Sequence, residues 1–203
     1  MLRLIDISHE YDNETILHDI SLQIEKKSFT IITGESGSGK STLLSIISTL
    51  LKPTKGALYF DEVKSTDIPN INHFRNKEVG FIFQFHYLIS HLTVYENISM
   101  VTKKSRDEIM HILEKLDIQI LVNKYPDQIS GGQRQRAAIA RAMINEPKYI
   151  FADEPTGNLD SKNSQIVFEL LRAMDATVIV ATHDLSRILD KDRIIQLKDG
   201  YLC

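Results

Sequence analysis

The eight residues 34–41, GESGSGKS, constrain the fold of this chain more than any other segment. They match the pattern G-x-x-x-x-G-K-[ST] and lie between a β-rich run at 28–33 and a stretch of helical spacing that Lys52 and Pro53 end. A strand, a glycine-rich turn and a helix in this order form a phosphate-binding loop, because the amides at the start of the helix face an anion. The alternative is a glycine-rich turn with a chance lysine, and the flanking strand and helix argue against it.

In such a loop each residue type has its own task. The glycines let the backbone curl around the phosphates, Lys40 reaches the β and γ oxygens, and the hydroxyl of Ser41 binds magnesium. The predicted nucleotide-binding residues of the segment are Gly34, Glu35, Ser36, Gly37, Ser38, Gly39, Lys40, Ser41 and Thr42.

Outside this loop, β-rich runs alternate with stretches of helical spacing. We expect strands at 2–8, 20–25, 57–60, 79–83, 148–153, 177–181 and 193–197, and helices at 93–121, 131–145, 161–174 and 184–190. The first two strands look antiparallel. The alternation predicts one α/β domain, 1–203, with a mostly parallel sheet covered on both faces. Residues 1–84 and 146–203 would form its core, and 85–145 an inserted helical subdomain.

Composition limits the partners and the compartment. The net charge of -3 argues against duplex nucleic acid as the main partner, since such binders usually carry a basic face. The single cysteine, Cys203, cannot form an intramolecular disulfide, which favours a reducing compartment. The N-terminal residues lack the apolar core of a signal peptide, and the apolar stretch 42–51 is shorter than the ~20 residues of a membrane span. We expect a soluble chain whose membrane role, if any, comes through a partner.

Polar residues follow two of the predicted strands. Asp153 and Glu154 end the run KYIFADE, where Asp153 could bind magnesium and Glu154 could orient or deprotonate an attacking water. Taken without the loop, an acidic pair before a proline is more often a solvated turn. His183 follows TVIVAT and could reach a γ-phosphate, although a histidine in that place often only caps or packs.

Three further features are ambiguous when each is considered alone. Gln84 ends VGFIFQ and could hydrogen-bond a metal-bound water, but a surface glutamine is commoner. Tyr11 could stack on an adenine ring or simply pack. In ISGGQRQR, 129–136, a serine and two glycines open a helix like half of an anion site that has no lysine. The arginines of this stretch, Arg134 and Arg136, could contact nucleotide, a neighbouring subunit or only solvent, and on a helix surface we expect them to face solvent.

Together these pieces resemble the ATP-binding subunits of ABC transporters, over essentially the whole chain and in the family's order. ISGGQ resembles the family signature, with Ile129 in place of the commoner leucine. By this resemblance, 34–41 is the Walker A loop, Gln84 the Q-loop glutamine, YIFADE the Walker B strand, Asn158-Leu159-Asp160 the D-loop, His183 the switch histidine and Tyr11 the adenine-stacking aromatic.

The resemblance implies a P-loop NTPase (RecA-like) core with an N-terminal antiparallel β subdomain and an inserted helical subdomain. It implies an ATPase that uses ATP and Mg²⁺. The implied catalytic residues are Glu154, His183 and Gln84, and the implied metal ligands are Ser41, Gln84 and Asp153. The remaining implied nucleotide contacts are Ser130, Gly131, Gly132, Gln133 and Asp160, the signature residues acting on the ATP of a second, identical or homologous subunit paired head to tail.

The resemblance also implies a place in the cell. The subunit would attach from the cytoplasm to a membrane permease, with Phe85, Tyr87, Leu88 and Leu92 as its docking surface. ADEPTGNLD and FIFQFHYLISHLTVYENI resemble the branch of lipoprotein-releasing, macrolide-export, cell-division and antimicrobial-peptide-resistance ATPases, which predicts an exporter of peptide, bacteriocin, lipoprotein or drug.

Two other functions are compatible with a phosphate loop. A soluble ABC ATPase acting on ribosomes or DNA would usually carry two motif sets or long coiled-coil insertions, and this chain has neither. A small-molecule phosphotransferase would leave the signature without a purpose.

Overall fold

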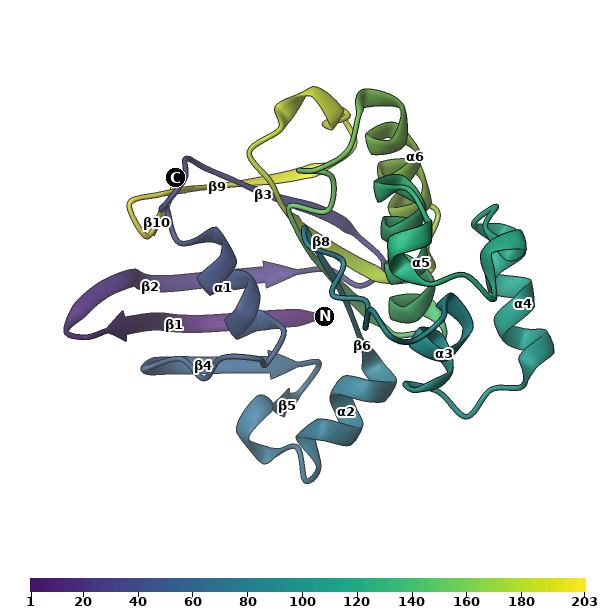
Figure 1. The fold of residues 1–203 in the computed structure, drawn as a ribbon. Helices are drawn as coiled ribbons and strands as arrows, with labels where there is room; N and C mark the ends of the chain where they lie inside the picture. Colours follow the sequence, from purple (N-terminus) through teal and green to yellow (C-terminus); the bar gives the residue numbers. More distant parts are fainter.

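The computed structural model describes residues 1–203, which form two β-sheets and the helices packed on them (Figure 1). The antiparallel sheet has the order β2-β1-β4-β5, formed by β1 (Leu2–Tyr11), β2 (Glu14–Ile24), β4 (Lys55–Phe60) and β5 (Val63–Lys64). The antiparallel pairing predicted for the first two strands is confirmed.

The second sheet is mostly parallel and has the order β10-β9-β3-β8-β7-β6. Its strands are β3 (Phe29–Thr33), β6 (Val79–Phe83), β7 (Tyr149–Asp153), β8 (Thr177–Ala181), β9 (Arg193–Lys198) and β10 (Tyr201–Leu202). Only β10 pairs antiparallel, with β9. The α/β fold with an N-terminal antiparallel sheet is therefore confirmed.

The parallel sheet is buried on both faces, which explains its continuous apolar strands. Side chains alternate between two cores: Ile150 belongs to the core under the long helices, and Phe151 to the core shared with the antiparallel sheet. Helix α1 (Lys40–Ile47) fills this second core with Leu43, Ile46 and Ile47. Helices α3 (Val94–Ser99), α4 (Arg106–Lys115), α5 (Gly131–Met143) and α6 (Ser161–Arg172) lie on the far side from β1 and β2 (Figure 1).

The single helix predicted at 93–121 is wrong. The segment forms α3, α4 and a short 3-10 turn at Gln119–Leu121. Ser105 and Glu108 form a capping box that starts α4 anew, and Asp117 leaves the helical region with a φ of 54°. These local polar side chains satisfy the ends of short helices, so apolar spacing alone overestimates helix length.

The helix predicted at 184–190 is also absent, because only Leu185–Arg187 forms a 3-10 turn. The carbonyl of Arg187 accepts a hydrogen bond from the Arg172 guanidinium, so it is not left for a following helical turn. At the other end of the turn, the Asp184 carboxylate accepts from the amide of Ser186.

Three smaller differences concern one turn and two helices. The polar stretch after β1 is a tight hairpin: Asp12 and Asn13 have φ values of 48° and 69°, as in a type I′ turn, so both strands are longer than predicted. Helix α1 ends at Ile47 rather than near residue 51, since Thr49 has a φ of 68°. Helix α2 (Ile71–Glu78) was not predicted.

No helix combines the length and the apolar character needed to cross a membrane.

Candidate active site

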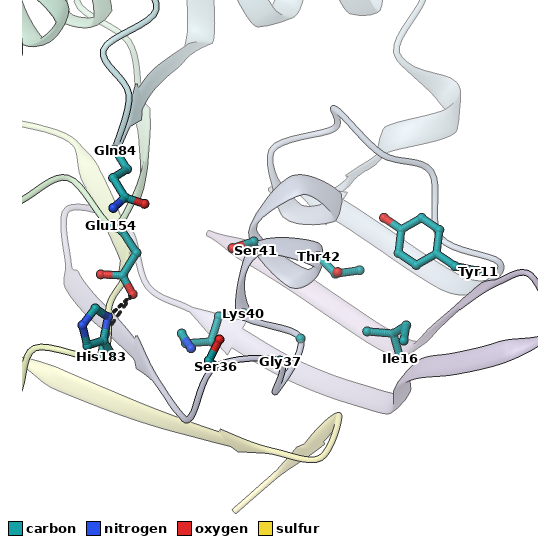
Figure 2. A pocket seen from close by; sticks show the side chains of 11 residues that line it. Tyr11, Ile16, Ser36, Gly37, Lys40, Ser41, Thr42, Gln84, Glu154 and His183 are labelled. Atoms are coloured by element: carbon teal, nitrogen blue, oxygen red, sulfur yellow. Dashed lines mark hydrogen bonds and ion pairs between the residues drawn. The ribbon is translucent and has the colours of Figure 1, made fainter. Parts of the chain in front are cut away.

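The carboxyl ends of β3, β6, β7 and β8 meet at one edge of the parallel sheet, as the pairing of these strands requires. A pocket of about 630 Å³ opens there. Figure 2 shows its lining: Tyr11, Ile16, Ser36, Gly37, Gly39, Lys40, Ser41, Thr42, Gln84, Glu154 and His183. Residues up to 172 positions apart are thus brought to one cavity, and most of them are predicted site residues.

The loop 34–39 is shaped by close approach and by left-handed backbone. A Cβ at Gly34 would lie 2.1 Å from the carbonyl oxygen of Leu197, so no side chain fits there. Gly39 starts α1 with a φ of 96° and no side-chain cap, which leaves the first amides of the helix free for an anion. The ammonium of Lys40 donates to the carbonyl oxygens of Gly34 and Glu35, at 2.8 and 2.7 Å, and is thereby held inside the loop.

The hydroxyl of Ser41 lies beside the carboxylate of Asp153. Ser41 Oγ donates to Asp153 Oδ1 at 3.1 Å. Burial raises the pKa of Asp153 above its ordinary value, with a smaller contribution from the charge of Glu154, while the Ser41 hydrogen bond opposes the shift. No three His, Cys, Asp or Glu side chains cluster as a metal cage. The Ser41 hydroxyl and the Asp153 carboxylate offer only oxygen atoms. A small set of protein oxygens suits Mg²⁺, because this ion keeps waters and substrate phosphates as its other ligands.

Glu154 is fixed by donors from the end of β8. Its Oε1 accepts from the amide of His183 at 3.0 Å and lies 2.7 Å from His183 Nδ1 (Figure 2). Its Oε2 accepts from Thr182 Oγ1 at 3.0 Å. The backbone of Glu154 has a φ of 43°, and its amide donates to Ala181. The predicted Glu154 and His183 therefore form one hydrogen-bonded unit at the pocket wall. Thr182 was missed, because a buried strand-end threonine carries no distinguishing pattern.

Gln84 and Tyr11 lie at different parts of the pocket. The Gln84 side chain packs on Gly157, where a Cβ would be 2.6 Å from Gln84 Nε2, and the backbone carbonyl oxygen of Gln84 accepts from Asn158 Nδ2 at 3.4 Å. Tyr11 lies at the rim on the other side, next to Ile16 (Figure 2). The buried ring of His9 contacts Tyr11 edge-on, with the centroids 4.6 Å apart.

The signature residues do not line this pocket. Ser130 caps α5: its Oγ accepts from the amide of Gln133, and Gln133 Oε1 accepts from the amide of Ser130 at 2.8 Å. A Cβ built on Gly131 would meet its nearest atoms only at an ordinary contact distance of 3.9 Å, and Ser130 is exposed, so the start of the helix is accessible. Asp160 also lies outside the pocket and caps α6 through the amide of Asn163, a bond that lowers the pKa of Asp160.

The prediction that Arg134 faces solvent is wrong. Its guanidinium folds back and donates to the carbonyl oxygens of Pro126 and Ile129, at 3.1 and 2.7 Å. Arg136 is half-buried, and its Nε is buried without a hydrogen-bond partner. Arg134 therefore supports the start of α5, and helical spacing alone does not reveal carbonyls that arrive from a preceding turn.

Comparisons with known proteins agree with this geometry. The sequence profile of a family described as ABC transporter matches residues 17–157. The chain is 43% identical over 199 residues to the lipoprotein-releasing system ATP-binding protein LolD of Buchnera aphidicola, covering 92% of this chain and 87% of that protein. It is 41% identical over 211 residues to the LolD protein of Leptospira interrogans, covering 98% and 89%.

Solved structures give the same result. A dimeric structure of MJ0796, a bacterial ABC transporter cassette, superposes with a TM-score of 0.90 at 37% identity, covering 100% of this chain and 96% of that one. A dimeric post-hydrolysis state of the same cassette, bound to ADP and Pi, superposes with a TM-score of 0.88 at 36% identity, with the same coverage.

Proposed function

The chain belongs to the ABC transporter family as an ATP-binding and ATP-hydrolysing subunit, and from this premise we propose how its residues hydrolyse ATP and what the hydrolysis drives. The observation that carries the proposal is the division of the machinery. Lys40, Ser41 and Glu154 line one pocket, and Asp153 is hydrogen-bonded to Ser41, whereas the exposed Ser130 at the start of the signature helix lies outside it.

The phosphates of ATP bind to the free amides at the start of α1 and to the Lys40 ammonium, which exchanges its two carbonyl partners for phosphate oxygens. Ser41, Asp153 and Gln84 would hold Mg²⁺, which neutralises phosphate charge when bound. The ring of Tyr11 stacks on the base.

Glu154 is the general base. Its carboxylate points into the pocket, and the donors from Thr182 and His183 fix its direction. It orients a water towards the γ-phosphate and accepts the proton as the water attacks. His183 contributes a donor at the same place, since its ring also lines the pocket.

The open start of α5 completes the site of a second subunit. A helix N-terminus supplies amide donors and a favourable dipole for an anion, and the lysine and metal ligands that would hold the rest of a nucleotide lie in the other pocket. Two copies, or this chain and a homologue, would pair head to tail so that Ser130 and Gly131 of one face the ATP on Lys40 of the other. The dimeric form of the MJ0796 cassette supports this pairing.

An aromatic surface next to Gln84 suits a membrane partner. Phe85 and Tyr87 are 61% and 64% exposed, and the ring of Phe83 lies 5.2 Å from that of Tyr87. Leu88 and Leu92 are only partly exposed, so the two aromatic rings form most of the surface. We assign this surface to a helix of a permease, which would place the subunit at the cytoplasmic face of the membrane. The similarity to lipoprotein-releasing system ATP-binding proteins favours lipoprotein as the cargo over peptide, bacteriocin or drug.

Substituting Glu154→Gln tests the base. The amide keeps the size of the side chain but accepts a proton poorly, so kcat should fall by about 100-fold or more while ATP binding and ATP-dependent dimerisation remain. A phosphate-release assay measures kcat, and light scattering measures ATP-dependent dimerisation. Glu114→Gln, at an exposed position of α4, is the matched control. Normal turnover by the Glu154 variant would refute its role.

Substituting Lys40→Ala tests the loop. Removing the ammonium from the pocket should raise the Kd for ATP in an equilibrium titration, because a charged donor to the phosphates is lost. An unchanged Kd would contradict the assignment of the loop.

A further inference from the structure

Helix α5 carries a buried glutamine that hydrogen-bonds the last residue of β6 and the segment after it. Gln135 is 1% exposed and lies on the helix that starts after Ser130. Its Nε2 donates to the carbonyl oxygen of Phe83 at 3.3 Å, and its Oε1 lies 2.9 Å from His86 Nδ1. Because the amide nitrogen already serves Phe83, the oxygen faces His86, and Nδ1 of that imidazole must carry the hydrogen. Burial lowers the pKa of His86, so its neutral form prevails at pH 7.

An arginine two turns further along α5 holds the same segment. Arg141 donates through its two terminal nitrogens to the carbonyl oxygens of Tyr87 and His86, at 2.7 and 2.9 Å. Tyr87 has a φ of 46°, a left-handed conformation that a bulky aromatic residue rarely adopts. The guanidinium fork stabilises this strained turn, which sets the direction of the exposed Tyr87 ring.

Beyond β6, fewer hydrogen bonds join this segment to the sheet. Phe83 is the last residue of β6 and pairs with Asp153 of β7. After it, the carbonyl of Gln84 accepts one long bond of 3.4 Å from Asn158. The hydrogen bonds of residues 86 and 87 go instead to α5. Phe83 is thus held by both the sheet and the signature helix, whereas residues 86 and 87 are hydrogen-bonded to the signature helix alone.

We propose that Gln135 and Arg141 are positioning residues that fasten residues 85–87 to α5, so that a displacement of Phe85 and Tyr87 moves Ser130 with it. The inference rests on the proposed function for the meaning of that displacement, which is the motion of a docked permease. A push on the aromatic surface then changes the position of the signature relative to the partner's ATP. Neither residue lines the nucleotide pocket, so each acts on closure rather than on ATP binding.

Steady-state kinetics separate these two effects. Gln135→Leu removes both hydrogen bonds at similar volume, and Arg141→Lys keeps the charge but loses the planar fork. Both should lower the kcat of the dimerising full-length chain by about 2- to 30-fold, the range of mutations along coupling networks, and leave the Kd for ATP within twofold. Gln165→Leu, an exposed glutamine of α6 that bonds only Glu169, is the matched control and should change neither.

A distance measurement tests the attachment without any permease. In a Cys203→Ser background, spin labels are attached at Phe85→Cys and at Asp127→Cys. Pulsed electron paramagnetic resonance then measures the distance between residue 85 and the turn before the signature. We expect one narrow distance distribution, unchanged by ATP, that broadens when Gln135→Leu and Arg141→Lys are combined. Circular dichroism identifies a variant that fails to fold, and Arg141→Lys alone is the milder test.

The outcomes distinguish the two proposals. If the unlabelled parent protein hydrolyses ATP but the combined variant keeps both the narrow distribution and the parent kcat, the attachment proposed here is wrong and the ATPase assignment stands. If the parent protein neither dimerises with ATP nor hydrolyses it, the proposed function fails whatever the distance shows.

Discussion

The buried ion pair between Arg172 and Asp192 holds the segment that follows His183. Arg172 Nη2 lies 2.6 Å from Asp192 Oδ2, and the two side chains are 13% and 1% exposed. Asp192 also accepts from the amide of Leu189, and the Arg172 guanidinium stacks on the rings of Phe29 and Phe168 at 4.9 and 5.3 Å.

Asp192→Asn should destabilise the protein strongly. The substitution keeps the shape but leaves the Arg172 guanidinium buried without its counter-ion, a change that costs about 3–5 kcal/mol. That is a large part of a typical stability of about 5–15 kcal/mol. At about 2–4 °C per kcal/mol for a chain of this length, the melting temperature should fall by roughly 6–20 °C. The double variant Arg172→Met, Asp192→Leu should cost less than Asp192→Asn, since no unpaired charge remains.

Urea unfolding of the nucleotide-free chain measures these differences. The control is Asp175→Asn, which breaks the pair with Lys27 where both side chains are largely exposed, and it should cost less than about 1 kcal/mol. If Asp192→Asn unfolds within about 1 kcal/mol of the parent, or if the double variant is less stable than Asp192→Asn, the reasoning about the buried charge is refuted.

Three further variants test the site. Gly34→Ala should lower the free energy of unfolding by about 1–3 kcal/mol in urea, because its Cβ would lie 2.1 Å from the backbone carbonyl oxygen of Leu197, whereas Gly131→Ala meets atoms only at 3.9 Å and should not. Burial raises the pKa of Asp153 in the folded protein, so the free energy of unfolding decreases as the pH rises from the unfolded-state pKa to the folded-state pKa of this carboxyl group. Without metal, Asp153→Asn should therefore have a higher free energy of unfolding than the parent at pH 7, and this difference should disappear in acid. The variant should also lose any stabilisation by Mg²⁺, and equal melting temperatures of variant and parent at pH 7 would contradict the argument. Tyr11→Ala should raise the Kd for ATP by about 5-fold or more in a titration if the ring stacks on the base, and an unchanged Kd would remove it from the site.

Local chemistry carried much of the sequence prediction. The pattern ending in Lys40 and Ser41 requires a turn between a strand and a helix, and the structure has one there. The order of the strand-end residues then follows from the parallel sheet, which brings Gln84, Glu154 and His183 to one edge. These predictions depend on a few residues whose spacing is set by strand geometry.

Helix limits were harder to predict, because they depend on which carbonyls are free. Apolar spacing continues past residue 100, but the capping box of Ser105 divides the helix there. The segment after His183 has helical spacing, yet Arg172 takes the carbonyl of Arg187. A bond between residues 15 positions apart cannot be read from a local pattern.

By itself, the sequence determined the phosphate loop, the strand-end carboxylates and the capped helix that bears the signature, since each depends on short-range backbone and side-chain chemistry. Only the tertiary structure decided that Thr182 and His183 hold Glu154, and that Gln135 and Arg141 hold the segment after Gln84. The latter bonds join residues about 50 positions apart in the chain, and their geometry exists only once α5 has packed against β6.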